Sequence, residues 1–163
     1  AMLRTVRVYL FAVLLFPVPP RFDFQPFYGP EQPLAGGGTI RHFALEHPGG
    51  VVGYRLDWPD RSLAYITDTT ADPNADYVEQ IRGVDILLHE CNFTDDLEEI
   101  ARMTGHSWTS GVAAVAKAAD VGMLVLVHID PTLTADDPVN IAQAQRIFPN
   151  VIQGEDNMEL ELG

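Results

Sequence analysis

Histidines and a carboxylate stand at the ends of short apolar runs in this sequence. His47 follows Phe-Ala-Leu-Glu, Asp68 follows Ala-Tyr-Ile-Thr, and His128 follows Leu-Val-Leu-Val. Such runs predict strands, and layered α/β folds often carry functional side chains where strands end and loops begin. Imidazole nitrogens together with a carboxylate oxygen form a donor set suited to Zn²⁺, Mn²⁺ or Fe²⁺. These three residues are therefore candidate metal ligands.

The same residues also have plain structural explanations. A lone histidine is more often a surface or core residue than a ligand, and an aspartate after a strand, such as Asp68, is typical of a turn. His89 and Glu90 follow the run Val-Asp-Ile-Leu-Leu, where polarity at a strand end is a sufficient explanation. His106 stands just before a predicted helix, among residues typical of a helix start. On residue types alone both interpretations remain open.

The elements that must position these residues are predicted as strands first and then as alternating strands and helices. Period-two patterns and buried apolar runs predict strands at residues 39–45, 51–58, 62–67, 84–89, 123–128, 151–153 and 158–162. Helical patterns and capping residues predict helices at 75–82, 95–103, 107–119 and 138–147. The proline- and glycine-rich residues 17–38 predict an irregular connector. This order predicts an α/β fold of mixed sheet flanked by helices.

An apolar run at residues 8–16 (VYLFAVLLF) allows two interpretations. Two arginines precede it, as in a secretory signal, but prolines follow it and no small-residue cleavage site appears. The run is too short to span a bilayer. Its β-branched and aromatic residues favour a buried strand that ends at the prolines.

Six short strings, taken in order, resemble the carboxyl-terminal half of the metallo-β-lactamase superfamily, and within it the RNase Z-like branch. They are FYGP (27–30), ALEHP (44–48) with GYRL (53–56), YITDT (65–69), DILLHECNF (85–93), GHSW (105–108) and LVLVHIDP (124–131). The resemblance covers residues 27–162 and implies a partial αββα sandwich. We therefore expect one domain over residues 1–163 that is incomplete on its amino-terminal side, with an atypical segment at residues 3–26.

The resemblance also implies roles for five residues. His47 matches a histidine ligand, Asp68 the carboxylate that bridges two metals, and His128 the last histidine ligand. Glu90 and His106 match a catalytic pair beside the metals that helps to hold the scissile phosphate or to protonate the leaving oxygen. The implied cofactor is zinc, or manganese or iron, and it is dinuclear where the site is intact.

One departure from the family pattern concerns the metal site. The superfamily's H-x-H-x-D-H string, which supplies most of the ligands, is absent from this sequence. Each metal would keep only two ligands from this chain, fewer than the three or four that hold zinc firmly. Three outcomes stay open: a single-ion site, ligands supplied by a second chain, or a site without metal.

The charge of the chain bears on its partners. Asp and Glu number 23 against 10 Lys and Arg, which gives a formal net charge of −13. Such acidity argues against a nucleic-acid surface and against anionic membranes. The gap between His47 and Asp68 has room for a hairpin but not for the long arm of tRNA-processing members. We therefore expect a small phosphoester or ester substrate, no tRNA and no membrane partner.

Two functions of different kinds follow. The first is a metal-dependent hydrolase, phosphodiesterase-like and acting on a small substrate. The alternative is a folded but non-catalytic fragment, or a half-domain that forms a homo-oligomer through an exposed sheet face. The lone cysteine, Cys91, excludes an internal disulfide and fits a cytoplasmic protein.

Overall fold

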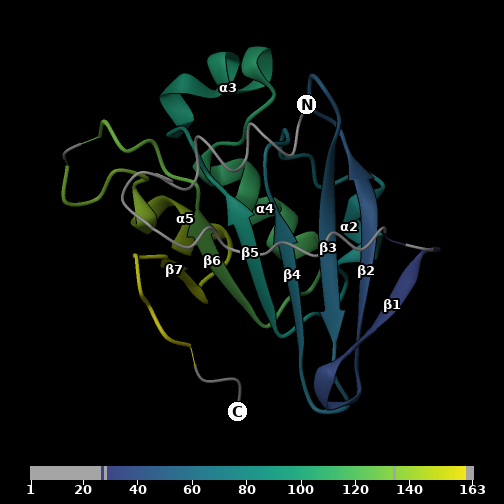
Figure 1. Ribbon diagram of the computed structural model, residues 1–163. Helices are drawn as coiled ribbons and strands as arrows, with labels where there is room; N and C mark the ends of the chain where they lie inside the picture. Colours follow the sequence, from purple (N-terminus) through teal and green to yellow (C-terminus); the bar gives the residue numbers. More distant parts are fainter. Residues whose placement is uncertain (1–26, 28, 134, 161–163) are drawn as a thin grey trace, which may run out of the picture.

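A seven-stranded mixed sheet with helices on one face organises the chain (Figure 1), in a computed structural model that describes residues 27, 29–133 and 135–160. The strands are β1 (Glu31–Leu34), β2 (Gly38–Leu45), β3 (Val51–Asp57), β4 (Ser62–Ile66), β5 (Ile86–Glu90), β6 (Met123–Val127) and β7 (Val151–Gln153). They lie side by side in chain order, antiparallel from β1 to β4 and parallel from β4 to β7. The predicted α/β class with a mixed sheet is therefore confirmed.

Each helix overlaps one of the four predicted ranges and is shorter than predicted. The helices are α2 (Tyr77–Gln80), α3 (Glu98–Thr104), α4 (Thr109–Ala118) and α5 (Ile141–Ile147), with 3₁₀ turns at Ala35–Gly37 and Asp95–Leu97. Of these, α3 ends one residue beyond its predicted range. In α4, the buried side chains are small, which lets the helix pack closely on the sheet. Within the described residues, no helix combines the length and apolarity that crossing a membrane requires.

The strand directions decide where the functional side chains meet. β2 and β4 each pair antiparallel with β3, so β2 and β4 run in the same direction, and β5 and β6 run parallel to β4. The carboxyl ends of these four strands therefore lie at one edge of the sheet. The turn between β3 and β4 lies at the opposite edge.

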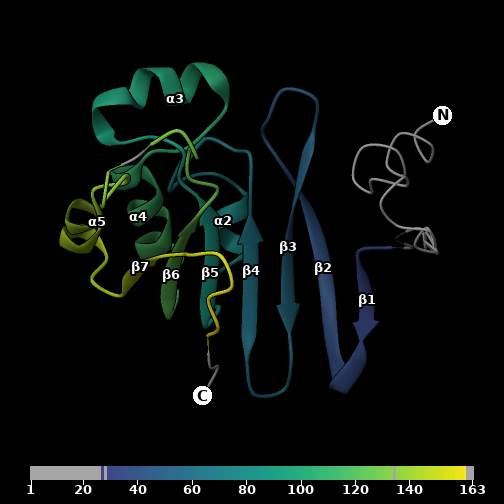
Figure 2. The ribbon, with the colours of Figure 1, turned by 60° about the vertical axis from the view of Figure 1, so that its left-hand side comes forward.

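The two faces of the sheet differ in how they are covered. On one face Ile66, Leu87 and Leu126 are fully buried in a core with α4. On the other face Leu88 and Val127 help to line an apolar groove, and the chain after β7 crosses it (Figure 2). No helix covers this face among the described residues.

The structure corrects two element predictions. Part of the predicted connector is strand: β1 pairs with β2 and contains Pro33, which hides the pattern but is tolerated because β1 is an edge strand. Residues 158–160 are not in a strand, although 158–162 is predicted as one. The apolar run at residues 8–16 and the atypical segment 3–26 lie outside the described residues.

Candidate metal centre

Polar side chains from four strand ends gather at the carboxyl edge of the sheet. His47 lies two residues after β2, Asp68 two residues after β4, and His128 directly after β6, while Glu90 is the last residue of β5. His106 reaches the same edge from the turn between α3 and α4. The ring of His106 lies between the other two imidazoles, with centroids 5.3 Å from His47 and 5.5 Å from His128.

Glu90 is the buried anchor of this group. Its carboxylate is 0% exposed and accepts three hydrogen bonds. The backbone N–H of Thr69 (2.9 Å) and Nδ1 of His106 (2.9 Å) donate to Oε1, and the backbone N–H of Ser107 (3.1 Å) donates to Oε2. A carboxylate held in this way satisfies the buried charge and fixes the orientation of the His106 ring. Among these three donors, His106 is the side chain that connects Glu90 to the rest of the group.

A second buried pair lies beneath Glu90. His89 is fully buried; its Nδ1 donates to the backbone carbonyl of Glu90 (2.8 Å), and its Nε2 accepts from the hydroxyl of Tyr77 on α2 (3.1 Å). Burial lowers the pKa of His89 to about 4 and raises the pKa of the Tyr77 hydroxyl. His89 is thus a neutral ring that ties the end of β5 to α2.

His47 is oriented by the turn that carries His106. Its Nδ1 lies 3.0 Å from the carbonyl oxygen of Gly105, and because a carbonyl only accepts, Nδ1 carries the hydrogen. Gly105 ends α3 with a φ of 78°, and a Cβ there would lie 2.9 Å from the Nδ1 of His47. Glycine is therefore required both for the left-handed turn and for the close approach of the imidazole.

Asp68 and His128 form the open rim of the group. Both have left-handed backbone conformations, with φ of 46° and 54°, which are uncommon for residues other than glycine. The Thr67 hydroxyl donates to Oδ2 of Asp68 (2.7 Å), and Oδ1 lies 3.7 Å from Nδ1 of His128. Their side chains are 33% and 40% exposed, so they face solvent. Such conformations often mark functional sites, where the surroundings hold them in place.

Two overlapping sets of donors are close enough for an ion. One donor atom from each of His47, Asp68 and His106 lies within 4.8 Å of the others, and the same holds for Glu90, His106 and His128. The structure thus gathers all five predicted residues, but it does not group His47, Asp68 and His128 as one set of three. His106 belongs to both sets. His42, on β2, belongs to neither and packs against Phe27.

Sequence reasoning missed the residues that hold the site together. Ser107 or Thr109 is predicted to cap this helix, but neither caps α4, where the backbone N–H of Ser110 donates to the Asp95 carboxylate (2.8 Å). The backbone N–H of Ser107 donates to Glu90, and its hydroxyl donates to the backbone carbonyl of Thr69 (2.6 Å). Gly105 carried a usable signal, because a glycine directly before a candidate histidine suggests a tight turn.

Comparisons with known proteins agree with this arrangement. The family model described as a beta-lactamase superfamily domain matches residues 30–129. Ribonuclease Z of Methanosarcina acetivorans is 36% identical over 145 residues, which cover 89% of this chain and 44% of that protein. The metallo-beta-lactamase fold protein YhfI of Bacillus subtilis has a TM-score of 0.64 at 26% identity, covering 77% of this chain and 50% of that one. The short form of human tRNase Z has a TM-score of 0.54 at 24% identity, covering 58% of this chain and 36% of that one.

These relatives correct one expectation. The exclusion of tRNA as a partner is wrong, because the matched proteins include ribonucleases Z and a tRNase Z. The exclusion rests on the short gap between His47 and Asp68 and on the summed charge of the chain, whereas phosphate recognition depends on the local field at the site. The chain also spans only about half or less of the length of the curated relatives it matches, so its own charge sum is a poor guide to their surfaces.

Proposed function

The chain belongs to the metallo-β-lactamase superfamily, in its RNase Z-like branch, and from this premise we propose that it hydrolyses phosphodiester bonds with a bound divalent ion. The observation that carries the proposal is the meeting of three imidazoles and a carboxylate, His47, His106, His128 and Asp68, at one sheet edge. The names of the relatives support a nuclease-type reaction over other hydrolyses.

The donors present fit zinc or a similar ion. Nitrogen and carboxylate oxygen are its usual ligands, and three protein ligands with one open position are typical of catalytic zinc sites. A bound ion would polarise a phosphoryl oxygen and lower the pKa of a coordinated water. His47, Asp68 and His128 are the ligands that the family resemblance implies, and their partly exposed side chains leave a substrate room to reach them.

His106 is the residue to which the family resemblance assigns proton transfer. Its Nδ1 is bound to the buried carboxylate of Glu90, so the ring is held with Nε2 available. When Nε2 carries a proton and is not bound to the ion, it can protonate the leaving oxygen of a cleaved diester. Glu90 is then a positioning residue that keeps the ring aimed.

The substrate class is tested with two probes. A tRNA transcript represents the RNA substrates that the relatives' names indicate, and bis-p-nitrophenyl phosphate represents the small phosphodiester predicted from the sequence. We expect cleavage of at least one probe when Zn²⁺ or Mn²⁺ is supplied, and loss of cleavage in Asp68→Asn. His42→Gln is the matched control, because it removes a histidine that belongs to neither donor set. Protein that holds an ion but cleaves neither probe would overturn the proposed function.

A second candidate function is supported by the sheet face on which no described helix packs. Leu63, Leu88 and Val127 line an apolar groove there, and Tyr65 is 36% exposed. Apolar faces of this kind are typical of association surfaces. The candidate is a non-catalytic, self-associating half-domain. Sedimentation equilibrium tests it, and a mass of 18.0 kDa at all concentrations argues against it.

A further inference from the structure

We propose that this chain holds a single divalent ion with His47, Asp68 and His106 as its three ligands, His106 taking a ligand position. The inference concerns the same site as the proposed function and rests on it only for the kind of ion. It does not depend on turnover. Its starting point is that one donor atom from each of the three residues lies within 4.8 Å of the others.

The tautomer of His47 is already the one that a metal ligand needs. Its Nδ1–H donates to the backbone carbonyl of Gly105 over 3.0 Å, which leaves the unprotonated Nε2 for an ion. Metal-bound histidines usually donate their second ring nitrogen to a carbonyl or carboxylate in this way, since the bond fixes both tautomer and ring orientation.

His106 has the same arrangement with a stronger partner. Its Nδ1 lies 2.9 Å from Oε1 of Glu90, whose carboxylate is fully buried. A carboxylate that accepts a hydrogen bond from a metal-bound histidine is a common arrangement, and it raises the basicity of the nitrogen that binds the metal. With only 18% of its side chain exposed, His106 is also more buried than Asp68 and His128 at the rim.

His128 lacks such support. Its Nδ1 lies 3.7 Å from Oδ1 of Asp68, and the described residues offer its ring no hydrogen bond. The donor set that includes His128 also requires Glu90, whose two oxygens already accept three hydrogen bonds. Binding an ion through Glu90 would break that buried network, so the first set is favoured over the second.

The assignment has a consequence for the reaction. Nε2 of His106 is the one ring nitrogen left after the bond to Glu90, and it cannot bind an ion and donate a proton at the same time. A chain with His106 as a ligand therefore lacks this proton donor. It should cleave diesters with good leaving groups, such as p-nitrophenolate, far better than those with alkoxide leaving groups.

The test measures ion binding without any substrate. The full chain is titrated with Co²⁺, whose visible absorption reports the coordination, and zinc content is measured after dialysis. We expect about one ion per chain, and an affinity loss of about 100-fold or more in His106→Gln. His128→Asn should lose less than about 3-fold, because asparagine tolerates the left-handed backbone at this position.

Two controls separate a ligand role from a structural one. Ser107→Ala removes the hydroxyl contact with Thr69 in the same loop but no ion donor, so its folded fraction should bind Co²⁺ as the wild type does. Circular dichroism and thermal melting identify any variant that fails to fold. For such a variant, proton NMR of the Co²⁺-loaded wild type replaces the mutational test, because the paramagnetic ion shifts the ring protons of the histidines that bind it.

The outcomes are decisive in either direction. Loss of binding in His106→Gln with retention in His128→Asn supports the proposal, even if the protein cleaves no probe and the proposed function fails. Loss in His128→Asn with retention in His106→Gln, or no ion bound by the wild type, overturns it. If binding is lost in His128→Asn and retained in His106→Gln, ion-dependent cleavage would still support the proposed function.

Discussion

The candidate site has two halves that differ in almost every physical respect. The inner half consists of Glu90, His89 and Tyr77, all buried and all hydrogen-bonded to one another or to backbone groups. The outer half contains Asp68 and His128, which are partly exposed and have uncommon left-handed backbones. His106 joins the two halves, since one ring nitrogen bonds Glu90 and the ring lies beside His128.

The difference separates what stabilises the fold from what is available for chemistry. Buried polar groups are costly unless every one is paired, so the inner half contributes to stability only as a complete network. Exposed donors contribute little to stability and remain free to bind an ion or a substrate. Substitutions in the inner half should therefore lower the free energy of unfolding, and substitution of Asp68 in the outer half should lower ion affinity.

Of the substitutions that test this comparison, Glu90→Gln should have the largest effect on the free energy of unfolding. The amide group that replaces one carboxylate oxygen cannot accept from the backbone N–H of Thr69 or Ser107, so a buried donor loses its partner. We expect the free energy of unfolding to fall by about 3 kcal/mol. Urea denaturation of the ion-free protein measures it.

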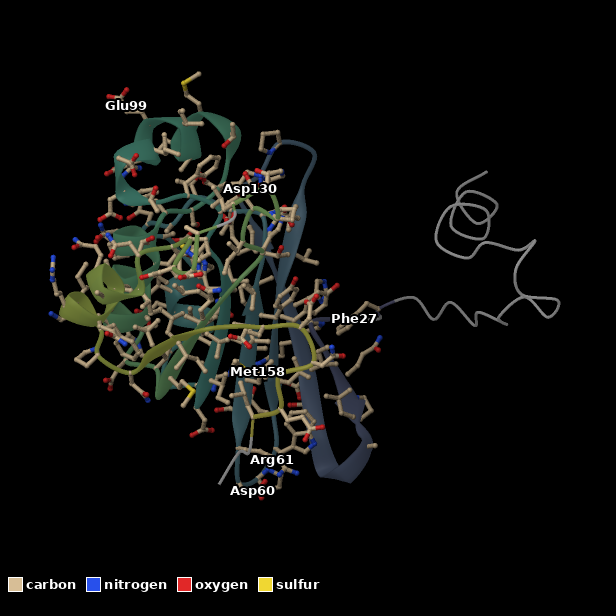
Figure 3. The ribbon with its side chains drawn as sticks, turned by 90° about the vertical axis from the view of Figure 1, so that its left-hand side faces the viewer. Phe27, Asp60, Arg61, Glu99, Asp130 and Met158 are labelled. Atoms are coloured by element: carbon tan, nitrogen blue, oxygen red, sulfur yellow. The ribbon has the colours of Figure 1, made fainter. Side chains whose placement is uncertain are left out.

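The matched control is Glu99→Gln, on the exposed side of α3 at the outside of the molecule (Figure 3). It should change the free energy of unfolding by less than about 0.5 kcal/mol. If the two variants are equally stable, the hydrogen bonds that Glu90 accepts do not stabilise the fold.

The pH dependence of stability should follow from His89. Burial lowers its pKa from 6.5 to about 4, so the unfolded chain binds a proton below pH 6.5 that the folded protein does not take up until about pH 4. The contribution of His89 to the free energy of unfolding is therefore fully present above pH 6.5, and it declines as the pH falls from 6.5 to about 4. The decline that comes from His89 is about 2 kcal/mol between pH 7.5 and 5.

Urea denaturation at the two pH values, in the wild type and in His89→Gln, isolates this contribution. Tyr77 and the backbone of Glu90 are the polar groups that face the ring, and neither titrates in this window as a free carboxylate would. The variant should start less stable and lose less on acidification. An equal loss in both proteins would show that His89 is not the group responsible.

Tyr77→Phe probes the edge of the inner half with a smaller effect. The change removes only the hydroxyl that donates to Nε2 of His89, and leaves that nitrogen buried without a donor. We expect a loss of about 1 kcal/mol, measured by denaturation. Tyr65→Phe, on the face of β4 that no described helix covers, is the control and should hardly change the free energy of unfolding. If both variants lose the same amount, the Tyr77 hydroxyl does not stabilise the fold through His89.

The sequence predicts the outer half better than the inner half. Asp68 and His128 follow strands whose patterns are clear, as His47 does, and strands of one direction bring their ends together at one edge. The partners of Glu90 cannot be predicted in this way, because Thr69 and Ser107 are backbone donors from distant loops. Pairing of that kind depends on tertiary packing, not on local residue pattern.

The strand predictions show the same division. The strands over residues 39–45, 51–58, 62–67 and 123–128 match the observed β2, β3, β4 and β6 to within one or two residues, because alternation or a continuous apolar run is strong there. β1 carries neither signal and exists because β2 offers it an edge to pair with. Tertiary pairing therefore decides both the missed strand and the missed anchors of the site.

Asp68→Asn is expected to have the smallest effect on stability and a large effect on ion binding. Asparagine accepts the left-handed φ of 46°, and its amide oxygen can still accept from the Thr67 hydroxyl. The free energy of unfolding without ion should change by less than about 0.5 kcal/mol, while ion affinity falls by about 100-fold.

Ion-dependent stabilisation measures both quantities in one experiment. An ion at 100 times its dissociation constant stabilises a protein that binds it only when folded by about 2.7 kcal/mol, and the same concentration should stabilise Asp68→Asn by less than about 0.5 kcal/mol. Asp60→Asn is the control, since Asp60 lies at the opposite edge of the sheet from Asp130 and the site (Figure 3) and should respond to the ion as the wild type does. If Asp68→Asn is as unstable without ion as Glu90→Gln, Asp68 belongs to the structural half, because its carboxylate would then stabilise the fold whether or not an ion is present.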